Sequence, residues 1–569
     1  MSLYGSIRLA SNALRADQIA LQVIGQNIAN ANTPGYIREE VELLPAPSQR
    51  MGGLILGLGV EVKAVVQVID NFLEERLRGA VSEEYSAETL ESTYTQLEQL
   101  IGALSDTDIS TAMTSFFNSV SEILNQPEDI SVRNLAVLNG TTLAQEVRGL
   151  ARRVGEVRAD LNERVKQTAD EINLLTEAIC SLNVRIAATE GGGVCKSDAV
   201  GLRDQRLVAL EDLAKLIDIH VKEQPNGTVS VYIGGDYLVA EGISRPVKVV
   251  LESNRGMTAA YVHLAQTDAR LDPSGGELHG LLVARDDGLG GFLAQLDNFA
   301  DTLAFEFNKI YSSGQGLSGY NTDWLTSQSY VRDPDAPLNN AGLKDQPVNG
   351  SFQVLVYDKE TKTSHTTDVD VDLNGIDPEN ETTLTSLARQ LNQIDGIKAE
   401  PTVNGNLRIR STSPIHEFAF ANDTSGLLAA LGINTFFTGS SALDLNVNPD
   451  VQEDPGKFAA SQGGIGVDTK NAVEMVAFPD APIEFQNGAS ISVLYDRMVD
   501  GATQGSTATH ATAEGARVFE QTLRGQKLAI SGVSIDEEAI RMIAFQKAFQ
   551  ATARYIGVIN ELLDILVQL

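Results

Sequence analysis

The sequence predicts a mainly α-helical protein that carries a β-rich insertion. Three observations support this fold class: heptad patterns of apolar residues at both ends of the chain, long helical patterns beside them, and a later region rich in Gly, Asp, Asn, Ser and Thr. At 569 residues the chain exceeds the usual size of one hydrophobic core, so we expect several domains.

The first predicted element is a helix that begins near Leu3. Apolar residues recur at alternating intervals of four and three, which is the spacing of a coiled-coil seam. Asp17 fills one step of a series formed by Leu3, Ile7, Ala10, Leu14, Leu21, Ile24 and Ile28. The helix ends before Pro34 and Gly35, because proline disfavours helix in the residue before it and glycine permits a left-handed turn.

The last predicted element is also a helix with a heptad seam. Ser534 and Glu537 have the spacing of a capping box, in which each side chain bonds to the other residue's backbone N–H. The seam comprises Ile535, Ala539, Met542, Gln546, Phe549, Ala553, Ile556, Asn560, Leu563 and Val567. Chain ends usually fray unless something ties them down, so we expect the two terminal helices to pair. We expect assembly to bring about this pairing, which the lone subunit lacks.

The chain between these ends is predicted as a helical shaft with a β-rich insertion. Helices are expected within about 67–127, with a break at Pro127. A second long helix then runs to about Glu190, and further helices are expected at Ala199–Leu216, 290–311 and 490–530. The second of these carries a seam at Val147, Leu150, Val154, Val157, Leu161, Val165, Thr168, Ile172, Leu175, Ile179, Leu182 and Ile186. The predicted domains are a terminal coiled coil (1–40 and 530–569), a shaft (41–315 and 465–529) with a small β subdomain at about 217–285, and an outer β-rich domain (316–464).

The charge excludes several classes of partner. A net charge of −33 disfavours nucleic acid and anionic membranes. Residues 1–60 hold four basic and four acidic side chains, and residues 530–569 hold three and five, so the acidic excess lies between the ends. No apolar run is long enough to span a bilayer, and Arg8, Arg15 and Asp17 interrupt what would be the core of a cleavable signal.

No catalytic motif is present, and we predict a non-enzymatic protein without catalytic residues, metal or cofactor. G-x-S-x-G, H-E-x-x-H and P-loop patterns are missing, and the six histidines are scattered. Cys180 and Cys195 are either a disulfide or two incidental thiols. The stretch from Asp370 to Glu381 fits a calcium-loop pattern, through Asp372, Asn374 and Gly375, but an Asn-Gly turn between a strand and a helix is the favoured interpretation.

Several motifs resemble those of the rod, hook and hook-associated proteins of the bacterial flagellum. Asn27–Tyr36 is similar to the signature that ends the first helix of this family, and Gly59–Val62 with Asp70–Ala80 is similar to the segment after it. Ser531–Glu538 and Phe545–Arg554 are similar to its C-terminal signature. Gly432–Phe437 is also typical of hook-associated members.

The resemblance implies a structural subunit at the junction between hook and filament, because the helical shaft and the Tyr36-x-Arg38 segment are most similar to members found there. Hook protein or another axial subunit is the alternative. The implied partners are further copies of the chain, flagellar hook protein, a second junction protein and a cytoplasmic export chaperone, without nucleic acid or membrane. Subunits would be exported unfolded and would assemble outside the cell.

The seams and the signature turn together define a candidate assembly interface. Its residues are Leu3, Ile7, Leu14, Leu21, Ile24, Ile28, Asn30, Asn32, Thr33, Pro34, Gly35, Tyr36, Ile535, Met542, Phe545, Phe549, Ile556 and Leu563.

Overall fold

The chain forms two compact units, each built from segments that are far apart in the sequence. The computed structural model describes residues 3–51, 54–102, 108–191, 199–376, 381–466 and 468–568. Unit 1 comprises Met1–Tyr94, Ala159–Asp286 and Thr507–Leu569, and unit 2 comprises Thr95–Arg158 and Asp287–Ser506. Long helices dominate and short strands lie between them, which confirms the predicted fold class.

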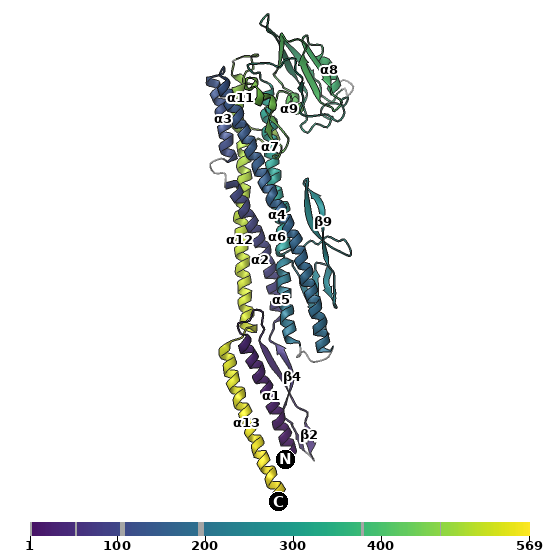
Figure 1. Ribbon diagram of the computed structural model, residues 1–569, viewed down its shortest axis with the longest axis vertical. Helices are drawn as coiled ribbons and strands as arrows, with labels where there is room; N and C mark the ends of the chain where they lie inside the picture. Colours follow the sequence, from purple (N-terminus) through teal and green to yellow (C-terminus); the bar gives the residue numbers. More distant parts are fainter. Residues whose placement is uncertain are drawn as a thin grey trace. The chain divides into compact units, whose positions relative to one another are not determined.

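Helices occupy most of the positions at which the sequence predicts them (Figure 1). They are α1 (Leu3–Asn30), α2 (Asn71–Gly102), α3 (Ile109–Asn125), α4 (Ile130–Glu190), α5 (Val200–Leu216), α6 (Gly276–Val283), α7 (Gly290–Ser312), α8 (Leu384–Leu391), α9 (Leu427–Leu431), α10 (Pro449–Glu453), α11 (Lys470–Ala477), α12 (Ile491–Ser531) and α13 (Ile535–Gln568). The break predicted at Pro127 is confirmed, since α3 ends at Asn125 and α4 begins at Ile130.

The strands form small antiparallel sheets. In unit 1 they are β1 (Glu39–Pro45), β2 (Gln49–Met51), β3 (Leu54–Leu56), β4 (Val60–Gln67), β5 (His220–Glu223), β6 (Val229–Ile233), β7 (Asp236–Ala240), β8 (Ile243–Ser244), β9 (Val247–Asn254) and β10 (Met257–Leu264). In unit 2 they are β11 (Leu325–Thr326), β12 (Gly350–Asp358), β13 (Thr363–Val371), β14 (Ile397–Pro401), β15 (Leu407–Ser411), β16 (His416–Ala421), β17 (Phe437–Thr438) and β18 (Asn446–Val447).

In unit 1 a long β-hairpin follows α1 and packs against it. β1 pairs with β4 in antiparallel register from Glu39 opposite Gln67 to Pro45 opposite Val60, with a shift between Glu42 and Leu43. Both strands contact α1. Asp70 then begins α2, because its carboxylate accepts hydrogen bonds from the N–H groups of Phe72 and Leu73 and so satisfies two free donors of the first turn.

The seam predicted along α4 is confirmed by burial. Eleven of its twelve positions are buried, and Leu175 is half-buried. Apolar residues at these intervals form one stripe of the helix, so α4 presents a continuous hydrophobic face to its neighbours.

The helical part of unit 2 is centred on a group of aromatic rings. Phe116 stacks on Phe436 with centroids 5.2 Å apart and meets Phe307 edge to face at 5.4 Å. Asn308 orders the same segment, because its side-chain oxygen accepts hydrogen bonds from the N–H groups of Phe436 and Phe437. The Gly432–Phe437 motif therefore places its two phenylalanines in a core.

The β-rich part of unit 2 has a separate hydrophobic core between two three-stranded sheets and α8. The sheet orders are β13–β12–β16 and β11–β15–β14. Phe352, Val354, Phe418 and Phe420 of the first sheet and Leu407 of the second belong to this core. β12 and β15 thus contribute inward-facing residues from two different sheets to one core.

Gly140 offers a direct test of the aromatic core. A Cβ at this position of α4 would lie 2.5 Å from Cζ of Phe436 and 3.1 Å from Cε2 of Phe116. We expect Gly140→Ala to destabilise unit 2 by about 1–3 kcal/mol through overpacking, although alanine favours a helix by about 1 kcal/mol over glycine. Denaturant unfolding of the full chain measures the change.

Gly149 of the same helix provides the matched control. A Cβ there meets only the flexible side chain of Arg153, at 3.4 Å. Gly149→Ala should leave stability unchanged or raise it by up to about 1 kcal/mol. Equal effects of the two substitutions would contradict the packing argument.

Candidate assembly interface

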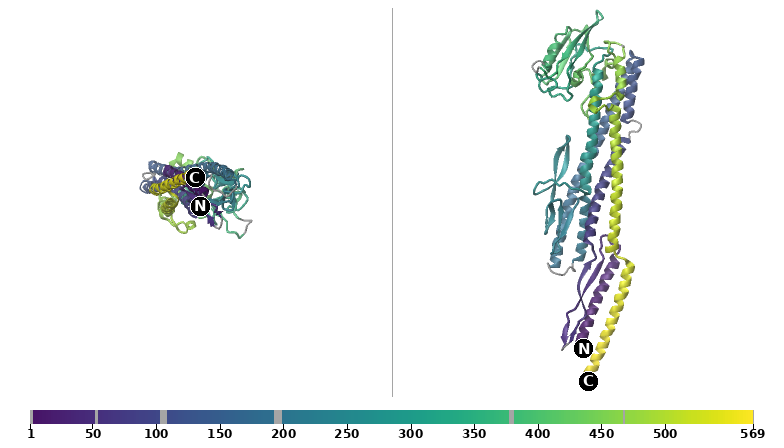
Figure 2. Two further views of the ribbon diagram at one scale, coloured as in Figure 1. Left: turned by 90° about the horizontal axis from the view of Figure 1, so that it is seen from below. Right: turned by 180° about the vertical axis from the view of Figure 1, so that it is seen from behind.

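Helices α1 and α13, from opposite ends of the chain, lie side by side in unit 1. They contact each other along their length, and Figures 1 and 2 show both chain ends at the same end of this helix pair. The predicted pairing of the ends is therefore present in a single chain. This differs from our expectation that the lone subunit leaves them unpaired.

The buried face of α13 follows a heptad whose register differs partly from the predicted one. From Met542 to Ile565 the buried and half-buried positions are Met542, Phe545, Phe549, Thr552, Ile556, Ile559 and Leu563. The predicted seam positions Met542, Phe549, Ile556 and Leu563 are indeed half-buried. The predicted positions between them, Gln546, Ala553 and Asn560, are exposed. Ile535 is also exposed, and Ala539 is half-buried. The sequence permits both registers because α13 has more apolar residues than one seam requires.

The predicted interface residues of α1 lie mainly on its covered sides. Ile24 is buried, and Ile7, Leu14, Leu21, Ile28 and Asn30 are half-buried. Small buried residues let neighbouring elements approach closely: Ala10, Ala16 and Ala20. The Leu3 side chain lies outside the described part of the structure.

Asn27 connects α1, the hairpin and α13 through hydrogen bonds. Its side chain is 0% exposed, and its amide donates to the Glu39 carbonyl at 2.9 Å and to Oε2 of Glu538 at 3.1 Å. Its oxygen accepts from the Tyr36 hydroxyl at 2.8 Å and from the Glu39 N–H at 3.0 Å. All four hydrogen-bonding positions of the amide are used, which is what a buried polar side chain requires.

Ion pairs at the start of α13 add to this connection. Glu538 is 1% exposed, and its Oε1 lies 3.6 Å from Nη1 of Arg541. The Arg38 N–H donates to the Ser531 carbonyl at 2.9 Å. Only half of the predicted capping box forms: the Glu537 N–H reaches Oγ of Ser534 at 3.5 Å, whereas the Glu537 carboxylate lies 3.6 Å from Arg38.

The signature turn after α1 is fixed by local hydrogen bonds and by contact with α5. The Thr33 hydroxyl donates to the Asn30 side-chain oxygen at 3.2 Å, and the Tyr36 N–H donates to the Thr33 carbonyl at 3.2 Å. Gly35 has φ +77°, and a Cβ on it would lie 2.3 Å from Cγ2 of Val208. Glycine is therefore required for both conformation and space. Asn32, Thr33, Pro34 and Gly35 are exposed, and Tyr36 is half-buried.

Beside this turn lies a pocket of about 570 Å³ that contains two acidic side chains, Glu39 and Asp204. Burial raises the pKa of Asp204 to about 6, against hydrogen bonds from the Gln67 amide and the Ile37 N–H that favour the carboxylate. Burial, and then the charge of Asp204, raise the pKa of Glu39. The pKa of Tyr36 is also raised above its usual value, mainly by burial and then by the negative charges of Glu39, Asp204 and Glu538. Negative charge is thus destabilising beside the turn.

The opposite face of α13 carries an exposed apolar stripe. We call these residues the outer stripe: Ile540, Ile543, Tyr555, Val558, Leu562 and Ile565. Exposed apolar surface of this extent is typical of sites that bind other proteins. Sequence reasoning did not assign these residues to the interface, and it also omitted Asn27 and Glu538, although both lie within the motifs that carry the resemblance.

The structure also places the remaining candidate sites. The Gly375 N–H donates to Oε1 of Glu381, and residues 377–380 and Cys195 lie outside the described residues. Nowhere in the described chain do three or more His, Cys, Asp or Glu side chains form a group that suits a metal ion. No described helix is long and apolar enough to cross a membrane.

Comparisons with known proteins relate these features to the flagellum. Three family models match: the flagellar hook-associated protein FlgK helical domain at residues 94–323, the C-terminal model of flagellar basal body rod FlgEFG proteins at 524–569, and the flagella basal body rod protein model at 7–36. Flagellar hook-associated protein 1 of Salmonella typhimurium is 23% identical and that of Escherichia coli 24% identical, each over 99% of both chains.

Two further similarities concern part of the chain. Flagellar hook-associated protein 1 of Bacillus subtilis is 27% identical over 56% of this chain and 69% of its own length. The solved structure of the flagellar hook junction protein FlgK from Burkholderia pseudomallei aligns with a TM-score of 0.49 at 16% identity, covering 80% of this chain and 100% of that one.

The Asn27 network predicts a defined loss on substitution. Asn27→Ala removes the hydrogen-bond partner of the Tyr36 hydroxyl and of Oε2 of the buried Glu538, so we expect unit 1 to lose about 2–4 kcal/mol of stability. Hydrogen–deuterium exchange should become faster throughout 535–568. Asn32→Ala, at an exposed position of the same signature, should change neither quantity. Unchanged exchange in the Asn27 variant would contradict the role of the network.

Asp204 predicts a pH dependence. Its pKa is raised from 3.8 to about 6, so the folded chain binds a proton there that the unfolded chain releases, and stability falls as the pH rises through this window. Asp204→Asn should therefore raise the free energy of unfolding by about 1–2 kcal/mol above pH 6, after allowance for solvent screening, and by nothing below about pH 4.

Unfolding curves of the full chain at several pH values measure this difference. Asp212→Asn, at a half-buried acid of the same helix that pairs with Lys215, serves as the control and should show no gain of stability above pH 6. If Asp204→Asn raised the free energy of unfolding equally at all pH values, the buried charge of Asp204 would not be the cause.

Proposed function

Because this chain belongs to the flagellar hook-associated protein 1 family, we propose that it is a structural subunit that forms the junction between the hook and the filament of a bacterial flagellum. The observation that carries the proposal is the combination of terminal helices typical of rod and hook proteins with a FlgK-type helical domain at 94–323. Its role is mechanical, and we propose no catalytic activity.

The two faces of α13 suggest how subunits join. The inner face packs on α1 within the chain, and the outer stripe is left for a neighbouring subunit. Burial of such a stripe provides a favourable free energy of association of roughly 25 cal/mol per Å² of apolar surface. The acidic excess between the ends opposes unspecific association of the rest of the chain.

The proposed partners follow from this position in the flagellum. They are further copies of the chain in a ring, flagellar hook protein on one side, the second hook–filament junction protein on the other, and a cytoplasmic export chaperone before assembly. We propose that the subunit is exported unfolded and acts outside the cell, without contact with nucleic acid or membrane. The predicted interface residues and the three predicted domains remain proposals of the same kind.

Electron microscopy of flagella with a labelled chain tests the proposal. We expect label in one narrow band at the hook–filament boundary, and deletion of the chain should leave hooks without attached filaments. Label distributed along the whole hook would instead indicate hook protein, and label below the hook would indicate a rod subunit.

Substitutions on the two faces of α13 separate their roles. We expect Phe549→Asp to prevent junction formation and to unpair α13 from α1, because its charge would lie in an apolar seam. Val558→Asp, in the outer stripe, should also prevent junction formation while α13 remains protected from hydrogen exchange. Motility and exchange measurements give the two readouts.

Gln550→Asp is the control, because Gln550 is an exposed polar residue of the same helix. It should preserve both junction formation and protection. Normal junctions in either of the other two variants would refute the corresponding face as an interface.

A further inference from the structure

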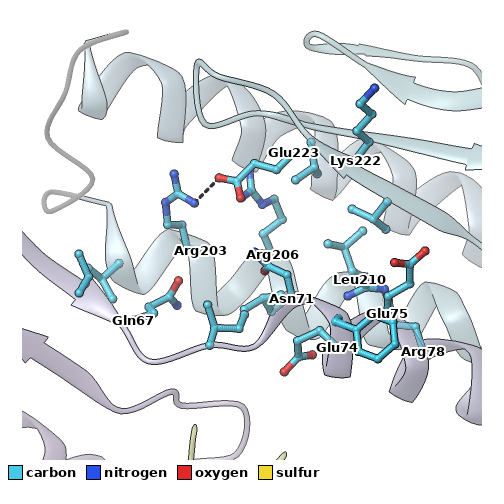
Figure 3. A pocket seen from close by; sticks show the side chains of 17 residues that line it. Gln67, Asn71, Glu74, Glu75, Arg78, Arg203, Arg206, Leu210, Lys222 and Glu223 are labelled. Carbon is cyan, nitrogen blue, oxygen red and sulfur yellow. Dashed lines mark hydrogen bonds and ion pairs between the residues drawn. The ribbon is translucent and has the colours of Figure 1, made fainter. Parts of the chain in front are cut away.

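A pocket of about 600 Å³ lies within unit 1, between the start of α2, helix α5 and strand β5. Figure 3 shows Arg78 of α2, Arg203 and Arg206 of α5 and Lys222 of β5 around it. The remainder of its lining is largely apolar: Val66, Ile69, Phe72, Val200, Leu207, Leu210, Val221 and Val229. Four basic side chains around one pocket are unusual in a chain whose net charge is −33.

The acidic residues of the pocket each lie near a basic side chain. Glu223 pairs with Arg203 at 2.8 Å, and Arg203 also binds Glu190 at 2.8 Å. Glu74 binds Lys527 of α12 at 3.1 Å, while Glu75 lies 3.8 Å from His220. These carboxylates therefore leave part of the positive charge of the pocket uncompensated.

Arg78 is a buried cation that lacks a partner in the described part of the chain. It is 8% exposed, and no hydrogen bond or ion pair joins it to any residue that the structure describes. Burial lowers its pKa, and the more distant charges of Glu74, Glu75 and Glu211 oppose this effect only in part. The Nε of Arg78 is buried without a hydrogen-bond partner in the described chain, and such a donor is costly unless a ligand or water satisfies it.

Arg206 and Lys222 extend the cationic surface. Arg206 is 4% exposed and binds only neutral oxygens, at Asn183 and Gly227, while its Nε has no partner among the described residues. Lys222 is exposed and forms no ion pair within the described chain. Phe72 is 68% exposed and stacks with the Arg76 guanidinium. The pocket thus offers an anion site together with an apolar surface for the group that carries the anion.

We propose that this pocket binds an acidic side chain of a second copy of this chain, with Arg78 as the buried counter-ion. Charge complementarity favours this occupant: each copy carries 76 acidic side chains against 43 basic ones. Arginine binds a carboxylate through two parallel N–H groups, and the stem of Asp or Glu with its flanking residues suits the apolar walls. The inference rests on the proposed function for bringing copies together, and adds an ionic contact that is separate from the outer stripe.

Photo-cross-linking in assembled flagella tests the proposal. A benzophenone amino acid replaces the exposed Phe72, and flagella isolated from irradiated cells are examined for covalent dimers. We expect dimers whose cross-linked peptide from the second copy contains Asp or Glu. Arg78→Gln should lower the dimer yield at least about tenfold, because it removes the buried counter-ion. Lys222→Gln should lower it several-fold.

Two controls keep the result interpretable. Arg78 is buried, so its variant is first checked for folding by circular dichroism, whereas Lys222→Gln alters an exposed residue and gives an independent test. Arg255→Gln removes one exposed positive charge of the same unit outside the pocket. It should leave the dimer yield unchanged.

Several results would overturn the proposal. They are the absence of dimers in flagella that contain the chain, cross-links only within one chain, and a dimer yield that both pocket variants leave unchanged. If inorganic phosphate raises the melting temperature more than chloride at equal ionic strength, and Arg78→Gln removes this effect while no dimer forms, the pocket binds a small oxyanion instead. The position of labelled chain in the flagellum is measured separately, so failure of the junction assignment is distinguishable from failure of this contact.

Discussion

The arrangement of unit 1 depends on one buried polar side chain. Asn27 bonds at once to the start of β1, to Tyr36 of the signature turn and to Glu538 of α13. A polar residue in an apolar seam is costly when it lacks partners, so it disfavours every register except the one in which all its bonds form. Apolar contacts between α1 and α13 supply most of the attraction, and Asn27 defines the axial register of the two helices.

Most of the fold could be predicted from the sequence because most helices are long and strongly periodic. The seam from Val147 to Ile186 is an example, since burial follows it almost position by position. The register of α13 could be predicted only in part. Its apolar residues form two stripes, and the choice between them depends on Asn27 and Glu538, which hydropathy alone marks as exposed. The Arg78 pocket could not be predicted from the sequence for a related reason. It depends on which basic side chains the fold leaves without partners.

Charge is distributed in this chain according to what each surface contacts. The outer stripe lies on a nearly neutral terminal segment, where a second copy meets little electrostatic repulsion. The acidic excess lies elsewhere and discourages contacts of other kinds. Within that acidic surrounding, a cationic pocket is selective, because it rewards one arrangement of two copies in which a carboxylate reaches Arg78. Apolar attraction and ionic selectivity are thus assigned to different surfaces of the same unit.

Unit 1 is assembled from three separate segments of the chain, the last of which is Thr507–Leu569. Unit 2 is complete once Ser506 is available, so it has all its residues before unit 1 does. Long-range contacts form late in folding, and the pairing of α1 with α13 joins the most distant residues that the chain has. If the chain emerges in sequence order, the outer stripe and the pairing of α1 with α13 can therefore form only after α13 has emerged. A copy of the chain without α13 therefore lacks both the outer stripe and the helix that covers α1.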